Sequence, residues 1–158
     1  MDAISLDTIN HLLDRYDNEE ALLEDQSKLI SHYPELYNLS TRDDFDILTE
    51  YELNTLNYLI LFVTMACADF LNKMPSFDLR QFEEIEDRLW GEFQDKRWST
   101  KTAFDHYFTI SQQEELLAII EDTLTIDPDD TENITTVGKE VIMITIVALI
   151  FTYDQLNG

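Results

Sequence analysis

Turn-forming residues are scarce in this chain, which has only three Gly and three Pro in 158 residues. Small β-domains need many tight turns, and Gly and Pro are the residues that most favour them. Their scarcity favours long helices joined by short polar connections. Hydrophobic residues form 44% of the chain, enough to build one core without disulfide support. We predict an all-α fold, a single acidic helical domain over residues 1–158 arranged as a bundle of about five to six helices.

Two apolar runs predict the two central helices of this bundle. The first follows a capping box, Thr49-Glu50-Tyr51-Glu52, and predicts a helix over Asn54–Lys73 that ends near Met74-Pro75. The second, Val137–Leu156, is rich in β-branched residues, which favour strands. Its apolar run of about 13 residues is too long for a usual strand and too short for a membrane span. We therefore expect two central apolar helices, buried on most sides.

Helical periodicity predicts the other helices of the domain. Their expected extents are Ser5–Tyr16, a segment from Asn18 that Pro34 stops, a helix from Asp78, a short helical turn at Thr102–Phe108, and a segment from Ser111 to Asp127-Pro128.

Local side-chain patterns add detail to these helices. The helix from Asp78 is expected to carry the ion pairs Glu84–Arg88 and Glu92–Lys96 on a solvated face. A second capping box, Ser111-Gln112-Gln113-Glu114, is expected to start the segment that ends at Asp127-Pro128. Between Pro34 and Leu48 the periodicity lapses, which predicts a long, irregular, acidic connection.

The net charge is the strongest functional signal in the sequence. The chain has 33 Asp and Glu against 10 Lys and Arg, a formal net charge of −23. Charge of this size affects partners, solubility and association rate rather than fold. We do not expect direct binding of nucleic acid, because binding to phosphate groups needs clustered Lys and Arg side chains. Six of the ten Lys and Arg residues do lie between Lys73 and Lys101, but seven acids share that stretch.

No residue pattern predicts a catalytic, metal or cofactor site. The pairs Glu83-x-x-Glu86 and Glu92-x-x-Asp95 resemble a magnesium-binding arrangement, but both fall on one helix and are interpreted as a solvated face. The segment from Asp127 to Gly138 imitates a calcium loop without its central Gly and its final Glu. His106 has no nucleophile to serve, and the lone Cys67 lies in an apolar run, so both are expected to be structural.

The N-terminus shows no secretion signal, so we expect a cytoplasmic protein with no membrane partner. We favour an acidic protein-binding module that inhibits or neutralises a partner with a basic surface, as an immunity protein neutralises a nuclease-type toxin. Three alternatives stay open: a non-catalytic structural or regulatory protein whose charge serves solubility, a nucleic-acid mimic, and an enzyme with an unrecognised carboxylate site.

The connection from Tyr33 to Glu52 is the predicted binding surface, because interfaces combine aromatic side chains with surrounding charges. The residues expected to contact the basic partner are Tyr33, Tyr37, Asp43, Asp44, Asp46 and Glu50. In the alternative interpretation, Phe45, Ile47 and Leu48 hold the loop to the core while the acids simply face water. Second choices are the Asp127–Glu132 loop and the face formed by Glu114, Glu115, Glu121 and Asp122.

We predict that the protein has no tight metal site, because each candidate spacing lacks at least one required ligand. Calorimetric titration with Zn²⁺, Mn²⁺, Fe²⁺ and Ca²⁺ should show only weak, non-selective binding that salt suppresses. A stoichiometric site of micromolar or tighter affinity would contradict this prediction and favour the enzyme alternative.

Overall fold

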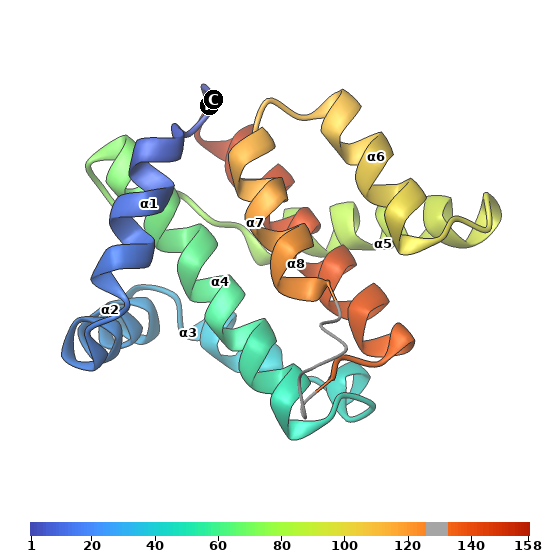
Figure 1. Ribbon diagram of the computed structural model, residues 1–158, viewed down its shortest axis with the longest axis horizontal. Helices are drawn as coiled ribbons and strands as arrows, with labels where there is room; N and C mark the ends of the chain where they lie inside the picture. Colours follow the sequence, from blue (N-terminus) through green and yellow to red (C-terminus); the bar gives the residue numbers. More distant parts are fainter. Residues whose placement is uncertain (126–132) are drawn as a thin grey trace.

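The computed structural model describes residues 1–125 and 133–158, and within them it contains helices and no strand (Figure 1). The all-α prediction is confirmed. Eight α-helices occur in these residues, more than the five to six expected. They are α1 (Leu6–Arg15), α2 (Glu19–His32), α3 (Pro34–Tyr37), α4 (Glu50–Leu71), α5 (Leu79–Asp95), α6 (Thr100–Ile110), α7 (Glu114–Leu124) and α8 (Thr136–Leu156).

The higher helix count has two sources. The predicted short turn at Thr102–Phe108 is part of the full helix α6, which Ser99 caps at its N-terminus. The predicted irregular connection after Pro34 is also partly helical, because it forms α3 and two 3₁₀ turns, η1 (Asn38–Thr41) and η2 (Asp43–Phe45). Pro34 ends α2 as expected, but it also opens α3 at its first position, where a missing N–H costs nothing.

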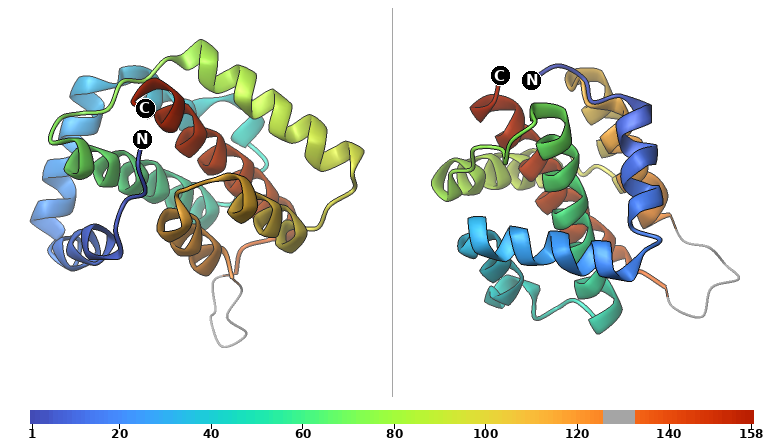
Figure 2. Two further views of the ribbon diagram at one scale, coloured as in Figure 1. Left: turned by 90° about the horizontal axis from the view of Figure 1, so that it is seen from above. Right: turned by 90° about the vertical axis from the view of Figure 1, so that its left-hand side faces the viewer.

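The two apolar runs form the centre of the molecule, as predicted. Helix α8 packs against α4, α5, α6 and α7, and α4 packs in addition against α1 and α2. Figure 2 shows α8 lying between α4 and α5 when the molecule is seen from above. Cys67 is fully buried on α4, and the β-branched run of α8 is buried on nearly all sides. Burial around the whole helix therefore overrides the strand propensity of these residues.

Both central helices are long and apolar enough to cross a membrane, judged by length and composition alone. In the most apolar window of each, however, 56% of α4 and 72% of α8 is buried inside the fold. Core helices of soluble proteins pass the same test, so the two helices are weak evidence for a membrane location.

Several local predictions differ from the structure. Glu84 pairs with Arg80 at 3.5 Å instead of with Arg88. Glu92 lies 3.4 Å from the Nε2 atom of His106 instead of pairing with Lys96. The second capping box does not form, because α7 starts after Gln113 with no side-chain cap.

The side chain of Gln113 is fully buried and has a different role. It accepts a hydrogen bond from the Ile4 amide at 3.0 Å, and it donates to the Asp2 carbonyl at 2.9 Å and to Asp154 at 3.0 Å. One amide therefore joins the N-terminal segment to the end of α8, and the two chain termini lie side by side (Figure 2).

The carboxylate of Glu52 connects the starts of α4 and α8. It is fully buried. Its Oε1 atom accepts from the Thr49 amide at 2.9 Å, which completes the predicted capping box of α4. Its Oε2 atom accepts from the amide and from the hydroxyl of Thr135, both at 2.8 Å, and Thr135 is the N-cap of α8. A Cβ atom at position 138 would lie 1.8 Å from Oε2, so any residue other than Gly would displace the Glu52 carboxylate from this position.

Hydrogen bonding decides the ionisation of Glu52. Burial works to raise the pKa of its carboxyl, but the bonds from Thr49 and Thr135 outweigh burial and the pKa is lowered. The positive ends of the two helix dipoles also favour a negative charge at this point. Glu52 is therefore ionised in the folded protein at neutral pH.

We predict that Glu52→Gln lowers the free energy of unfolding by about 2 to 3 kcal/mol, because a neutral amide replaces a charged acceptor of several hydrogen bonds. The exposed neighbour gives the control, since Glu50→Gln should change stability by less than about 0.5 kcal/mol. Chemical denaturation at pH 7 measures both values. Equal stability of the two variants would contradict the structural role of Glu52.

Comparison of the wild type with Glu52→Gln at several pH values tests the direction of the pKa shift of Glu52. A carboxyl whose pKa is lowered by folding contributes its full stability above the unfolded pKa, about 4.3, and loses it as pH falls through the folded pKa. The difference in stability between the wild type and Glu52→Gln should be constant above about pH 6 and should shrink below about pH 4.

Candidate functional site

The segment between α3 and α4 is held against the core by three apolar side chains. Leu36, Leu39 and Phe45 are all buried, and they come from α3, η1 and η2 in turn. Leu48 is half-buried against the same core, whereas Ile47 is 59% exposed. The alternative interpretation, in which these side chains hold the segment to the core, is therefore confirmed for Phe45 and Leu48 and is wrong for Ile47.

A partly buried ion pair adds a polar attachment between this segment and α5. Two guanidinium nitrogens of Arg42 donate to the two carboxylate oxygens of Glu86, both at 3.1 Å. The guanidinium also lies over the ring of Phe45, 4.8 Å from its centroid. Glu86 is buried, so its interpretation as part of a solvated face is wrong. It lies beside Ile85 and one turn after Phe82, on the face of α5 that packs against α8.

The energetics of this pair depend on Arg42. Burial raises the pKa of the Glu86 carboxyl, and the hydrogen bonds from Arg42 only partly offset that effect. A buried carboxylate without its partner is strongly destabilising, by about 3 to 5 kcal/mol. Arg42 is the only base between Tyr33 and Glu52. The single positive charge of this segment therefore forms ion pairs with Glu86 and, at 3.5 Å, with Asp44.

The predicted contact residues separate into two groups. Asp43, Asp44, Asp46 and Glu50 are all exposed, and Tyr37 is 54% exposed. Tyr33 is buried: its hydroxyl donates to the carbonyl of Pro75, and its ring packs edge-on against Phe77 at 6.2 Å. Tyr33 is therefore a core residue, and its side chain is not available on the surface.

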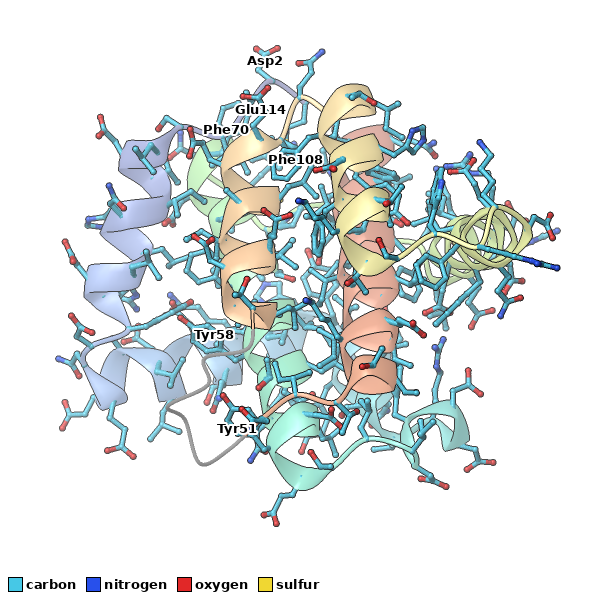
Figure 3. All side chains as sticks on the ribbon, turned by 45° about the vertical axis from the view of Figure 1, so that its right-hand side comes forward. Asp2, Tyr51, Tyr58, Phe70, Phe108 and Glu114 are labelled. Carbon is cyan, nitrogen blue, oxygen red and sulfur yellow. The ribbon has the colours of Figure 1, made fainter. Side chains whose placement is uncertain are left out.

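Two exposed apolar residues lie among the acids. They are Ile47 and, at 38% exposure, Tyr51. Figure 3 shows Tyr51 at the end of the molecule where α4 begins, opposite the end that carries Asp2 and Glu114. We call the exposed set Tyr37, Asp43, Asp44, Asp46, Ile47, Glu50 and Tyr51 the acidic surface. Sequence reasoning missed Ile47 as a surface residue, because an aliphatic residue beside Leu48 looks like core.

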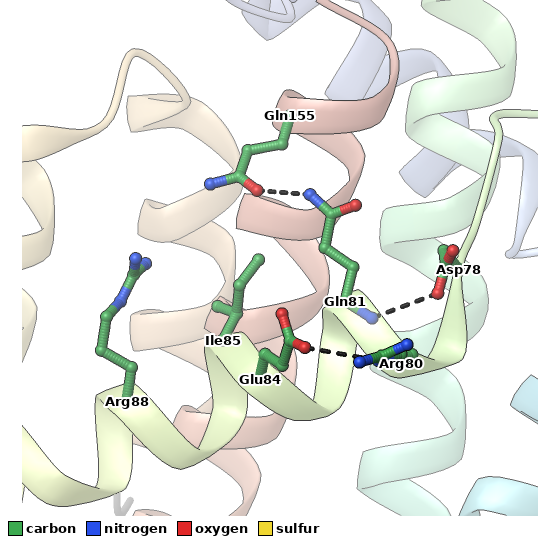
Figure 4. Close-up of a pocket in the computed structure, with 7 residues that line it drawn as sticks. All are labelled: Asp78, Arg80, Gln81, Glu84, Ile85, Arg88 and Gln155. Atoms are coloured by element: carbon green, nitrogen blue, oxygen red, sulfur yellow. Dashed lines mark hydrogen bonds and ion pairs between the residues drawn. The ribbon is translucent and has the colours of Figure 1, made fainter.

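Two open hollows lined partly by charged and polar side chains lie elsewhere on the described surface. A groove of about 490 Å³ between α5 and α8 is lined by Gln81, Arg88 and Gln155, among others (Figure 4). In it Gln81 donates to Gln155, and Arg80 pairs with Glu84. A cleft of about 920 Å³ between α1, α2 and α4 contains His11, His32 and several charged residues.

The structure places Cys67 and His106 and shows no metal-binding cluster in the described part of the chain. Within residues 1–125 and 133–158, no three His, Cys, Asp or Glu side chains are grouped to hold a metal ion. Burial raises the pKa of the Cys67 thiol far above its usual range, so it is not a nucleophile at neutral pH. His106 is half-buried beside Glu92, and its ring lies tilted against the ring of Trp98, with the centroids 4.8 Å apart.

The second-choice surfaces have different outcomes. The Asp127–Glu132 loop, which is also the first half of the calcium-like segment, lies outside the described residues. On α7, Glu114 and Asp122 are exposed, whereas Glu115 and Glu121 are half-buried.

Comparison of the chain with protein-family models, with the curated proteins and with the solved structures finds no significant match.

We predict that Arg42→Met lowers the free energy of unfolding by about 3 to 5 kcal/mol at pH 7, because it leaves Glu86 buried and unpaired. The double variant Arg42→Met/Glu86→Leu should recover most of this loss, since it removes both charges. A carboxyl with a raised folded pKa destabilises as pH rises through that pKa, so the defect of Arg42→Met should be smaller near pH 4. Denaturation curves at both pH values measure these differences. A double variant no more stable than Arg42→Met would contradict this role of the pair.

Proposed function

We propose that the protein is an acidic binding module that occupies a basic surface of a partner protein and neutralises it. One observation carries the proposal: exposed apolar side chains lie among exposed acids, in a part of the chain where acids far outnumber bases. Residues 19–61 contain ten acids and two bases. Both bases are already ion-paired within the chain, Lys28 with Glu24 and Asp25 and Arg42 with Glu86 and Asp44.

The composition of the acidic surface supports this proposal over a purely solubilising charge. Solubility requires exposed charge but no exposed aromatic residues. Protein interfaces, in contrast, combine aromatic side chains that bind tightly with charges that select the partner and speed encounter. Tyr37, Ile47 and Tyr51 supply the first component, and Asp43, Asp46 and Glu50 supply the second.

Site-specific photo-crosslinking in the source cells tests where a partner binds. A photoreactive amino acid replaces Ile47 in one variant and Ile110 in a control variant. Ile110 is an exposed isoleucine at the C-terminal end of α6. The proposal expects a basic protein crosslinked from position 47 and not from position 110. The activity of the purified partner should fall to zero when an equimolar amount of the acidic protein is added. An acidic partner, or a partner whose activity is unchanged, would overturn the proposal.

We predict that association with the captured partner slows at least about tenfold between low and physiological salt, where the Debye length is about 8 Å. The triple variant Asp43→Lys/Asp44→Lys/Asp46→Lys should slow association further, because it reverses the field at the contact. Stopped-flow mixing measures both rates.

The matched control makes the same change in net charge elsewhere. Glu83, Asp95 and Asp105 are exposed acids on α5 and α6, and their reversal to Lys should have a smaller effect on the rate. Equal effects of the two triple variants would show that the overall charge of the protein, and not the acidic surface, determines the association rate. A salt-independent rate would remove the electrostatic mechanism.

A further inference from the structure

A small apolar pocket opens beside the acidic surface, at the corner where α2, α3 and α4 meet. Eight residues line it, of which six are apolar or aromatic and none is charged. Its volume is about 230 Å³. Pockets for drug-sized ligands usually measure about 300 to 1,000 Å³, so this one has the size for one large side chain rather than for a cofactor.

The pocket has a rigid apolar floor and an exposed apolar rim. Leu36, Ile60 and Leu61 belong to its floor and are almost completely buried. Ile30 and Tyr37 belong to its rim and are 42% and 54% exposed. Large apolar side chains exposed around an apolar hollow are typical of a surface that receives another apolar group.

The charge around the pocket restricts what can occupy it. All the residues that line it lie within residues 19–61, a stretch that contains ten acids and only two bases, both of them ion-paired. A neutral apolar peptide would gain nothing from this field, and an acidic one would be repelled. A segment that carries Lys or Arg on both sides of one apolar residue matches the pocket and its surroundings together.

We propose that this pocket receives a single large aliphatic side chain from a Lys- or Arg-rich segment of the partner. The inference rests on the proposed function, because it assigns the specific contact of the same basic partner. The acids of the acidic surface bring the basic segment close, and the pocket then holds it by burying the aliphatic side chain. In this arrangement Tyr37 belongs to both features, as the end of α3 and as the rim of the pocket.

Two synthetic peptides of equal length and equal Lys content provide the probe. One contains a central Leu and the other has Ser at that position. The Leu peptide should bind at least about tenfold more tightly, since burying a Leu side chain is worth more than 1.4 kcal/mol, the equivalent of tenfold. Both affinities should fall as salt is added. Fluorescence anisotropy measures them.

Two isoleucines give a matched pair of variants. Ile30→Ser alters the rim of the pocket, whereas Ile110→Ser makes the same change at an exposed position outside it. The preference for the Leu peptide should be lost in Ile30→Ser and in Tyr37→Ser, and kept in Ile110→Ser. In the wild-type protein, the methyl NMR signals of Ile30 should shift on adding the Leu peptide and those of Ile110 should not, a measurement that needs no variant to fold.

The outcomes separate this inference from the proposed function. Equal, salt-sensitive affinities for the two peptides would overturn the pocket and leave acidic binding of a basic partner intact. A Leu preference that survives in Ile30→Ser would also overturn the pocket. Failure of both peptides to bind at low salt would overturn the pocket and the proposed function together.

Discussion

The central pair of helices depends on one buried charge. The N-termini of α4 and α8 meet at the same end of the core, where their unsatisfied amides and the positive ends of two helix dipoles come together. Without a counter-charge this junction would be unfavourable. Glu52 supplies that charge and accepts three hydrogen bonds from Thr49 and Thr135. The room for its carboxylate exists only because residue 138 is Gly.

The same principle recurs where other elements join. Asp25 accepts hydrogen bonds from Arg15 at 2.9 and 3.0 Å and from the Tyr16 hydroxyl at 2.8 Å, which links α2 to the end of α1. Burial works to raise the pKa of Asp25, but these donors outweigh it and the pKa is lowered. In a chain with a large excess of acids, burial of an acid is tolerated where donors surround it, and such sites lie at junctions between helices.

The sequence was sufficient to predict the fold class and the core, because those depend on patterns within single segments. The capping box at Thr49 and the apolar run of α8 are of this kind, and both predictions hold. Some local predictions failed, such as the Glu84–Arg88 ion pair and the capping box at Ser111. The errors at Glu86 and Tyr33, in contrast, involve contacts between segments distant in sequence. No feature of the sequence near Glu86 predicts its ion pair with Arg42. None near Tyr33 predicts that its hydroxyl donates to the carbonyl of Pro75. The exposed acids followed from composition, whereas the apolar pocket required three helices to be placed in space.

Arg42 links the stability of the fold to the character of its surface. Its guanidinium neutralises Glu86 inside the protein and lies over Phe45, so the segment that follows has a fixed position on α5. Because Arg42 is the only base between Tyr33 and Glu52, its pairing with Glu86 and Asp44 leaves Asp43, Asp46 and Glu50 without a second base in this segment. A fixed acidic segment loses less conformational entropy on binding than a flexible one would. The ion pair that holds the segment therefore also prepares it to meet a basic partner.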